Sequence, residues 1–167
     1  MIVASGDAEL VIEKNTVISG NTFTGGDSSN PNSLFDVYNS TVTMNGGAIK
    51  DNSFGWYTLI NLEGSSKFVM NDGSISDNVY AGSKSNPALV RLFISSKFVM
   101  NGGTISDNIL GGSSAAVVNS MVNGSDIVVF NGGTVSGNTA KYLAYGRTGN
   151  VSIGTGATID NKNVYAF

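Results

Sequence analysis

The sequence of 167 residues contains neither cysteine nor histidine. Without these side chains there is no thiolate or imidazole ligand for a metal ion, no cysteine nucleophile and no histidine base for a catalytic triad. Any catalysis would therefore depend on carboxylates, lysine, tyrosine or hydroxyl groups.

Charge and long apolar runs are also scarce. Charged residues make up 13% of the chain, and the net charge is −3 with the few Lys and Arg scattered, so no basic stripe can hold a phosphate backbone. No apolar run approaches the roughly 20 residues of a membrane span, and residues 1–10 lack the features of a signal peptide. We expect a single domain over residues 1–167, without a nucleic-acid partner and without membrane insertion.

What the chain does contain is an internal repeat. Residues 97–108, KFVMNGGTISDN, nearly restate residues 67–78, KFVMNDGSISDN. Aligned on the closing position, the other copies are LVIEKNTVISGN (10–21), TVTMNGGAIKDN (41–52), IVVFNGGTVSGN (127–138) and the degenerate VSIGTGATIDNK (151–162). Alternating apolar runs broken by Gly-Gly and Asn about every 30 residues indicate coils of a β-solenoid rather than helical repeats.

Each copy divides into extended pieces and corners. Residues 97–101 form the first strand and residues 104–106 the second, and Gly102 and Gly103 turn the corner between them. After a second corner and a connector of variable length, a third strand follows, as at residues 89–94. Stacking the copies predicts three interior ladders: Val42, Phe68, Phe98 and Val128; Met44, Met70, Met100 and Phe130; and Ile18, Ile49, Ile75, Ile105 and Val135.

These features predict an all-β, single-domain, right-handed parallel β-helix of about six coils with three short strands per coil. The closing residues Asn52, Asn78, Asn108 and Asn138 are expected to form an internal ladder in which each amide bonds the neighbouring coils, as stacked amides do in cross-β structures. We interpret them, like Gly102 and Gly103, as structural residues.

The phrases MNGGAIKDN, MNGGTISDN and FNGGTVSGN resemble the Gly-Gly-Thr/Ala-Ile-Ser-x-Asn repeats of bacterial surface proteins that form right-handed parallel β-helices. They are also similar to repeats of chlamydial polymorphic outer-membrane proteins and autotransporter passengers. The resemblance implies an extracellular or cell-surface location and an adhesive or stalk role, in chains of which this sequence would be a fragment.

Two sets of residues are candidates for binding. Aromatic side chains gather in the connectors at Trp56, Tyr57, Tyr80 and Tyr142, where they either present rings to sugars or proteins or fold over the third strand as local core. An outward column of mostly apolar residues is either a lateral contact surface or a result of β-propensity. The alignment assigns to this column Ile12, Thr43, Val69, Val99, Val129 and Ile153.

Asp51, Asp77 and Asp107 occupy the same corner in three consecutive copies. Neighbouring carboxylates would lie about one strand spacing apart, roughly 5 Å, which suits a shared Ca²⁺ or a glycosidase pair. The other interpretation is that the corner needs a left-handed residue, because glycine takes the place of Asp in other copies. Calcium is therefore the one cofactor that the pattern suggests, and no other cofactor is expected.

The ends of the repeat suggest a taper. The first copy carries Glu13 where others have methionine, and the last carries Ser152 and Gly154 at ladder positions, so the domain is either cut from a longer array or stacks end to end with other copies.

The main hypothesis is a non-enzymatic structural or adhesive rod of a bacterial or phage surface protein that binds glycans or host proteins by repeated lateral contacts. The alternatives are a self-assembling filament subunit and a carbohydrate-active lyase or glycosidase that uses Asp77 and Asp107. A catalytic solenoid is expected to break its repeat where the site is built, whereas the middle copies here are the most regular.

Overall fold

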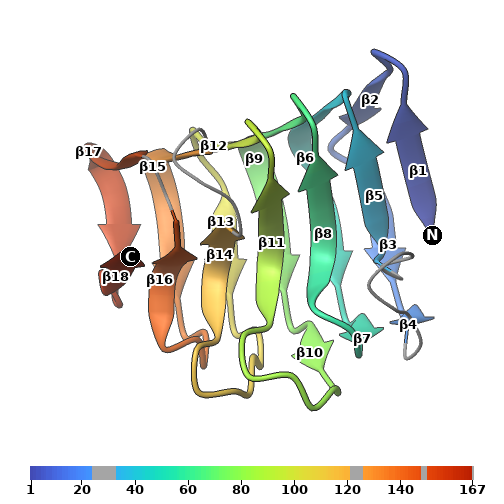
Figure 1. Ribbon diagram of the computed structural model, residues 1–167. Coiled ribbons are helices and arrows are strands. Elements are labelled where there is room, and N and C mark those ends of the chain that lie inside the picture. The colour runs from blue at the N-terminus through green and yellow to red at the C-terminus, as the bar shows by residue number, and fades with distance from the viewer. Residues whose placement is uncertain (24–32, 121–125, 148–149, 167) are drawn as a thin grey trace.

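The structure is a computed structural model that describes residues 1–23, 33–120, 126–147 and 150–166. In these ranges every regular element is a strand, and every strand pairing is parallel. Figure 1 shows the strands standing side by side along one axis, with the two termini at opposite ends of the stack. The same ranges contain no helix that is long and apolar enough to cross a membrane.

A seven-stranded sheet forms one side of the solenoid, in the order β1-β5-β8-β11-β14-β16-β18. It contains the third strand of each predicted coil. Its members are β1 (Ile2–Ser5), β5 (Phe35–Tyr38), β8 (Thr58–Glu63), β11 (Ala88–Phe93), β14 (Ala116–Ser120), β16 (Tyr142–Gly146) and β18 (Val164–Ala166).

An eight-stranded sheet forms the opposite side and contains the repeated phrase. Its members are β2 (Glu9–Ile12), β3 (Val17–Ser19), β6 (Thr41–Lys50), β9 (Lys67–Ser76), β12 (Lys97–Met100), β13 (Thr104–Ser106), β15 (Ile127–Ser136) and β17 (Asn150–Ile159). The predicted first and second strands of a copy therefore lie in one sheet, and in β6, β9, β15 and β17 they form one strand of 10 residues. Register shifts at the Asn-Gly positions of β6 and β15 mark bulges there instead of a full corner.

A third sheet, which the sequence did not predict, follows the closing asparagines in the order β10-β7-β4. Its members have only two residues each: β4 (Thr22–Phe23), β7 (Ser53–Phe54) and β10 (Val79–Tyr80). The stack makes about 4 turns, fewer than the six coils predicted. All six copies have a strand in the eight-stranded sheet, whereas only three copies are followed by a strand of the third sheet in the part of the chain that the structure describes.

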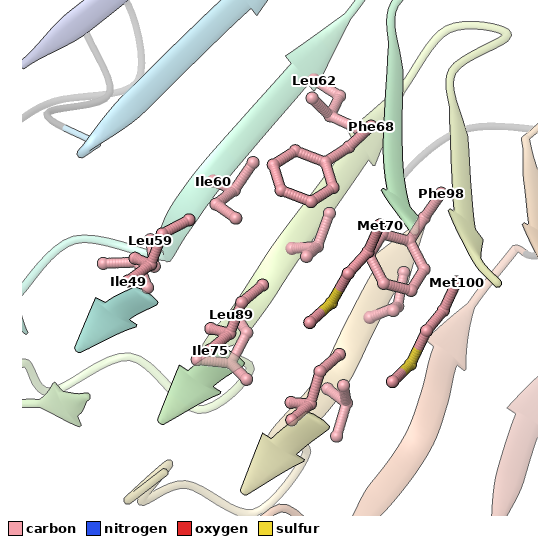
Figure 2. Packing of buried hydrophobic residues seen from close by; sticks show 14 of the residues in the cluster. Ile49, Leu59, Ile60, Leu62, Phe68, Met70, Ile75, Leu89, Phe98 and Met100 are labelled. Atoms are coloured by element: carbon pink, nitrogen blue, oxygen red, sulfur yellow. The ribbon is translucent and has the colours of Figure 1, made fainter. Parts of the chain in front are cut away.

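The core lies between the two large sheets and confirms the three ladders. Phe68 pairs in register with Phe98, and Met70 with Met100, and all four side chains are buried. Figure 2 shows these side chains facing residues of the seven-stranded sheet such as Leu62. The Phe68 and Phe98 rings stack with centroids 6.1 Å apart. Parallel in-register pairing thus repeats the same contact from coil to coil.

The ends of the predicted alignment are wrong by one residue. Leu10 pairs with Val42 and Ile12 with Met44, so Ile12 points into the core with only 2% of its surface exposed. The methionine position is therefore filled by Ile12 and not by Glu13. The first copy has one extra residue before Ile18, and a shift of one position moves a side chain to the other face of a strand.

The last copy is shifted for the same reason. Val151 pairs with Val128 and Ile153 with Phe130, so these two residues, not Ser152 and Gly154, occupy the ladder positions. The outward column accordingly consists of Val11, Thr43, Val69, Val99, Val129 and Ser152. The last copy therefore keeps apolar residues at the ladder positions, but they are less buried than in the middle copies, since Ile153 is 38% exposed.

Candidate functional site

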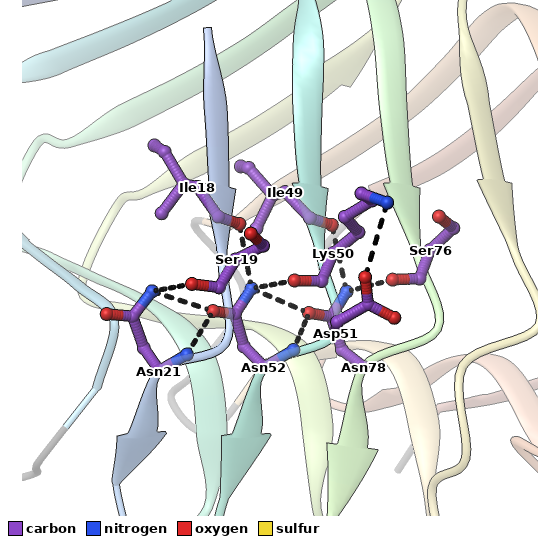
Figure 3. Close-up of polar contacts among 9 residues, drawn as sticks. All are labelled: Ile18, Ser19, Asn21, Ile49, Lys50, Asp51, Asn52, Ser76 and Asn78. Atoms are coloured by element: carbon purple, nitrogen blue, oxygen red, sulfur yellow. Dashed lines mark hydrogen bonds and ion pairs between the residues drawn. The ribbon is translucent and has the colours of Figure 1, made fainter.

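The closing asparagines form the predicted internal ladder. The Nδ2 of Asn52 donates to Oδ1 of Asn78 at 3.0 Å, and the Nδ2 of Asn78 donates to Oδ1 of Asn108 at 2.9 Å. Each Oδ1 also accepts the backbone N–H of the preceding asparagine, as between Asn78 and Asn108 at 3.0 Å. Figure 3 shows the start of the ladder at Asn21. Asn138 accepts the last of these bonds, at 2.8 Å from Asn108, and the ladder satisfies backbone and amide groups inside the corner.

A second amide ladder runs along the surface and was not predicted. Nδ2 of Asn71 donates to Oδ1 of Asn45 at 3.0 Å, and the same bond joins Asn101 to Asn71 and Asn131 to Asn101, both at 2.8 Å. These bonds point toward the N-terminus, opposite to those of the internal ladder. This second ladder could have been predicted from the sequence, because each of these asparagines directly precedes the Gly-Gly or Asp-Gly pair of its copy.

Gly103 adopts φ +80° in the stretch between β12 and β13. A Cβ on Gly103 would lie 2.6 Å from the carbonyl oxygen of Gly73, and a Cβ on Gly102 would lie 2.5 Å from that of Asn71. Both positions therefore require glycine because the backbone of the preceding coil approaches closely.

The three corner aspartates share a backbone feature. Asp51, Asp77 and Asp107 adopt φ between 54° and 56°, and Gly20 and Gly137 hold the same corner with φ of 70° and 66°. The left-handed corner is thus a sufficient reason for Asp or Gly here. Among the residues described, no group of three or more Asp, Glu, His or Cys side chains is placed to hold a metal ion.

The outward valines of the eight-stranded sheet lie next to one another. Val69, Val99 and Val129 pair in register on β9, β12 and β15, and each is half-buried. They form a narrow apolar stripe with exposed Lys67 and Lys97 beside it. The stripe offers apolar area but few hydrogen-bonding groups to a ligand.

The connector aromatics divide into two groups. Tyr80 is buried, its ring packs on Phe54 at 5.5 Å, and its hydroxyl donates to the Trp56 carbonyl oxygen at 3.0 Å. Trp56 and Tyr57 are half-buried, with ring centroids 5.0 Å apart, and Nζ of Lys84 lies 4.4 Å from the Trp56 ring centroid. Tyr80 therefore belongs to the local core, whereas Trp56 and Tyr57 present part of their rings to solvent.

The outer face of the seven-stranded sheet carries a column that the sequence analysis missed. One residue from each strand lies in register with the next, and its neighbours in sequence on β5, β8 and β11 are core residues. The outer column consists of Val3, Asp36, Asn61, Arg91, Asn119, Tyr145 and Tyr165. The signal was a polar residue inside an otherwise apolar third strand, such as Asn61 in LINLE and Arg91 in LVRLF.

A polar network joins the first half of the outer column. Nδ2 of Asn61 donates to Asp36 at 2.8 Å and to Glu63 at 3.0 Å, and Nη1 of Arg91 donates to Oδ1 of Asn61 at 3.5 Å. The guanidinium of Arg91 also lies 5.2 Å from the Phe93 ring centroid. Burial raises the pKa of Asp36 and lowers that of Arg91, because the charged forms of both lose water.

Tyrosine rings form the second half of the outer column. Tyr145 and Tyr165 stack with centroids 5.3 Å apart, and Tyr142 lies 5.3 Å from Tyr145 and 5.6 Å from Tyr165. Tyr142, which the sequence predicted as a binding residue, thus belongs to this cluster, and Nζ of Lys141 lies 5.1 Å from its ring centroid.

We call this whole surface the outer strip. It combines aromatic rings and both signs of charge on successive parallel strands with the buried amides of Asn61 and Asn119 between them. Rings and charged groups of this kind are suited to packing against sugar rings and hydrogen-bonding their hydroxyls. The outer strip consists of Asp36, Trp56, Tyr57, Asn61, Glu63, Lys84, Arg91, Phe93, Asn119, Tyr142, Tyr145 and Tyr165.

A hollow of about 600 Å³ lies at the first corner and is lined by residues including Asp7, Glu9, Asn39 and Ser40. The side chains of Asn39 and Ser40 accept backbone N–H bonds there, at 3.0 Å from Ser65 and 3.1 Å from Ala8. The hollow shares no residue with the outer strip, and its Asn39 and Ser40 side chains bond to the corner itself.

Comparison with protein families, with curated proteins and with solved structures gave no match.

Proposed function

We propose that the chain is a non-enzymatic rod of an extracellular or cell-surface protein, of the Gly-Gly-Thr/Ala-Ile-Ser-x-Asn repeat type, and that it binds glycans through the outer strip. The observation that carries the proposal is the register of Arg91, Asn119 and Tyr145 on three adjacent strands, beside the rings of Trp56 and Tyr57. Hydrogen-bonding groups and aromatic rings thereby lie next to one another on the same face of the sheet.

The parallel stack supports repeated shallow contacts. Adjacent strands lie about 4.8 Å apart, so the strip offers ligand groups at a regular spacing along the rod. A chain ligand that contacts several strands at once gains avidity, although each contact is weak. The outer strip serves this purpose better than the valine stripe, because valine side chains form no hydrogen bonds and present no ring to a sugar.

A glycan array tests this proposal. Wild-type protein is expected to bind a subset of glycans, and a Trp56→Ala/Tyr57→Ala variant is expected to bind them at least about tenfold more weakly, because two stacking contacts are lost. Val99→Thr, on the opposite sheet, is the matched control and should bind as wild type. If the Trp56→Ala/Tyr57→Ala variant binds the array as the control and the wild type do, the proposal is wrong. Release of shortened glycans by the wild-type protein would contradict a non-enzymatic role.

A second candidate is head-to-tail assembly of copies. Large apolar side chains are exposed in the first coil, with Val3 at 59% and Val17 at 59%, and in the last, with Val164 at 42% and Tyr165 at 47%. Edge strands β1 and β18 also have one side without a partner strand in the described sheet. Since an edge strand can pair with another chain, the two ends are suited to meet.

Concentration-dependent light scattering with electron microscopy checks the second candidate. We expect filaments at high concentration and expect Val3→Lys to shorten them, because a lysine on the edge disfavours pairing. A monodisperse monomer at high concentration would remove this candidate while leaving lateral binding intact.

A further inference from the structure

Asn119 stands in the middle of the outer column with one polar atom unused. Its side chain is almost fully buried, with 2% of the residue surface exposed, and its Nδ2 donates to the Asn86 carbonyl oxygen at 3.2 Å. Its Oδ1 is buried and has no hydrogen-bond partner. A buried acceptor without a donor costs free energy on folding, so its presence needs an explanation.

The residues around this oxygen could contact a ligand group that reaches it; we call this place the seat. Arg91 lies in register on one side of Asn119 and Tyr145 on the other. Gly146 follows Tyr145 with φ +111°, and a Cβ on it would lie 3.3 Å from Oδ1 of Asn119 and 2.0 Å from the Ser120 carbonyl oxygen. Glycine at this position keeps a side chain away from the unpaired oxygen.

The charge of a ligand group decides whether it can donate a hydrogen bond to Oδ1 of Asn119. Carboxylate and sulfate groups have no proton to give to Oδ1 at neutral pH, so they cannot satisfy this acceptor. A cationic donor is disfavoured by the guanidinium of Arg91 next to Asn119. An uncharged donor suits the site best. The stacked rings of Tyr145 and Tyr165, 5.3 Å apart, provide an apolar face beside it, which favours a hydroxyl carried on a sugar ring.

We propose that Asn119, Arg91 and Tyr145 form a seat for one uncharged sugar residue, whose hydroxyl donates to Oδ1 of Asn119 while its ring packs against Tyr145. This inference rests on the proposed glycan-binding function and specifies its ligand class. Because Oδ1 is buried, the sugar reaches it only when a neighbouring side chain shifts, so binding changes the environment of the outer-column side chains.

Titration by nuclear magnetic resonance with defined oligosaccharides tests the seat. The probes are the neutral hexasaccharides of β-1,3-glucose, α-1,4-glucose and β-1,4-mannose, and the acidic hexasaccharide of galacturonate. We expect at least one neutral probe to bind more tightly than the acidic one and to shift the Asn119 side-chain amide and Tyr145 ring signals.

The variants Asn119→Val and Tyr145→Ala are each expected to weaken binding of that probe about three- to tenfold, the effect of one hydrogen bond or one ring contact. Tyr38→Ala removes an exposed tyrosine from β5 of the same sheet and should leave the affinity unchanged. Asn119→Val should change the melting temperature little, because the loss of the bond to the Asn86 carbonyl oxygen is offset by removal of the unpaired acceptor and by the preference of valine for strands. A purely structural role for Asn119 would give the reverse pattern, with lower stability and unchanged affinity.

The outcomes separate the seat from the general proposal. If only the acidic probe binds, or if a neutral probe binds equally to folded Asn119→Val, the seat is wrong and lateral glycan binding stands. If Trp56→Ala/Tyr57→Ala and Tyr145→Ala all leave every bound glycan unaffected, both inferences are overturned.

Discussion

Each buried asparagine at the corners stabilises the fold by hydrogen bonds to the neighbouring coils. Asn108 accepts hydrogen bonds from the backbone and side-chain nitrogens of Asn78 and donates through Nδ2 to Ile75 and Asn138. It therefore links three coils through one side chain. The surface ladder has the same amide-to-amide bond, but its residues are open to water on one side.

We predict that Asn108→Ala lowers the free energy of unfolding by about 3 kcal/mol, because it leaves buried donors of Asn78 and an acceptor without partners. Asn101→Ala is the matched control from the surface ladder, where water replaces the lost partner, and should cost less than about 1 kcal/mol. Urea denaturation measures both. Equal losses in the two variants would show that the internal ladder has no special role.

Asp126 is a charged residue in a column of buried serines. It is fully buried, and its carboxylate accepts bonds from the Ser96 backbone at 2.9 Å and the Ser120 hydroxyl at 2.7 Å. Burial raises the pKa of Asp126, and the hydrogen bonds from Ser120 and Ser96 offset this only in part. The folded protein thus holds this proton more tightly than the unfolded chain does.

A raised carboxyl pKa adds stability below the ordinary value of about 3.9, and this contribution is lost as the pH rises through the raised pKa. We therefore predict that Asp126→Asn, which keeps an acceptor for Ser96 without the charge, increases the free energy of unfolding at pH 7 by about 1 kcal/mol. The gain should shrink at pH 3.5. Denaturation at both pH values measures it, and a destabilised variant at pH 7 would mean that the carboxylate bonds outweigh its burial.

At the scale of single elements, each copy of the repeated phrase depends on close approach between coils at its glycine pair. A Cβ on Gly103 would lie 2.7 Å from the Cε of Met70 as well as 2.6 Å from the backbone of Gly73, and the residue has φ +80°. We predict that Gly103→Ala costs about 2 kcal/mol or more, from left-handed strain and overpacking.

Gly111 provides the control for that substitution. A Cβ there would meet nothing within 4 Å, so Gly111→Ala should leave the free energy of unfolding within about 0.5 kcal/mol of wild type. Thermal or urea denaturation of the pair decides between local strain and a general effect of adding a methyl group. Similar losses in both variants would contradict the close approach at Gly103.

The strands of the middle copies were predicted from the sequence more accurately than those of the end copies and the third sheet. The interior ladders of β6, β9, β12 and β15 were predictable, because strand alternation and a constant spacing to the next ladder fix which side chains face inward. The spacing changes by one residue in the first and last copies, which misplaced Ile12 and Ile153. The strands of the third sheet, such as β7, are too short to show an alternating pattern.

The candidate site was predicted only in part. Trp56, Tyr57 and Tyr142 belong to the outer strip, but the sequence offered no reason to connect them with Asn61 or Arg91. Those residues lie on other strands, and their burial comes from neighbours that the register brings together. The unpaired oxygen of Asn119 follows from three-dimensional packing alone.

At the scale of the whole molecule, the two large sheets have different outer faces. The eight-stranded sheet shows the narrow valine stripe and the surface amide ladder, both repeated from coil to coil. The outer strip of the seven-stranded sheet changes along the rod, from carboxylates and Arg91 to the tyrosine cluster. Since repetition builds the stack, we interpret the varied face as the one that recognises a ligand.

The most direct test of this account is the affinity for the glycan that binds best on the array, measured for wild type, Trp56→Ala/Tyr145→Ala and Val99→Thr. We predict at least about a tenfold loss for the double variant, from two ring contacts, and no change for Val99→Thr. Undiminished binding by the folded double variant, or a loss confined to Val99→Thr, would contradict the assignment of binding to the outer strip.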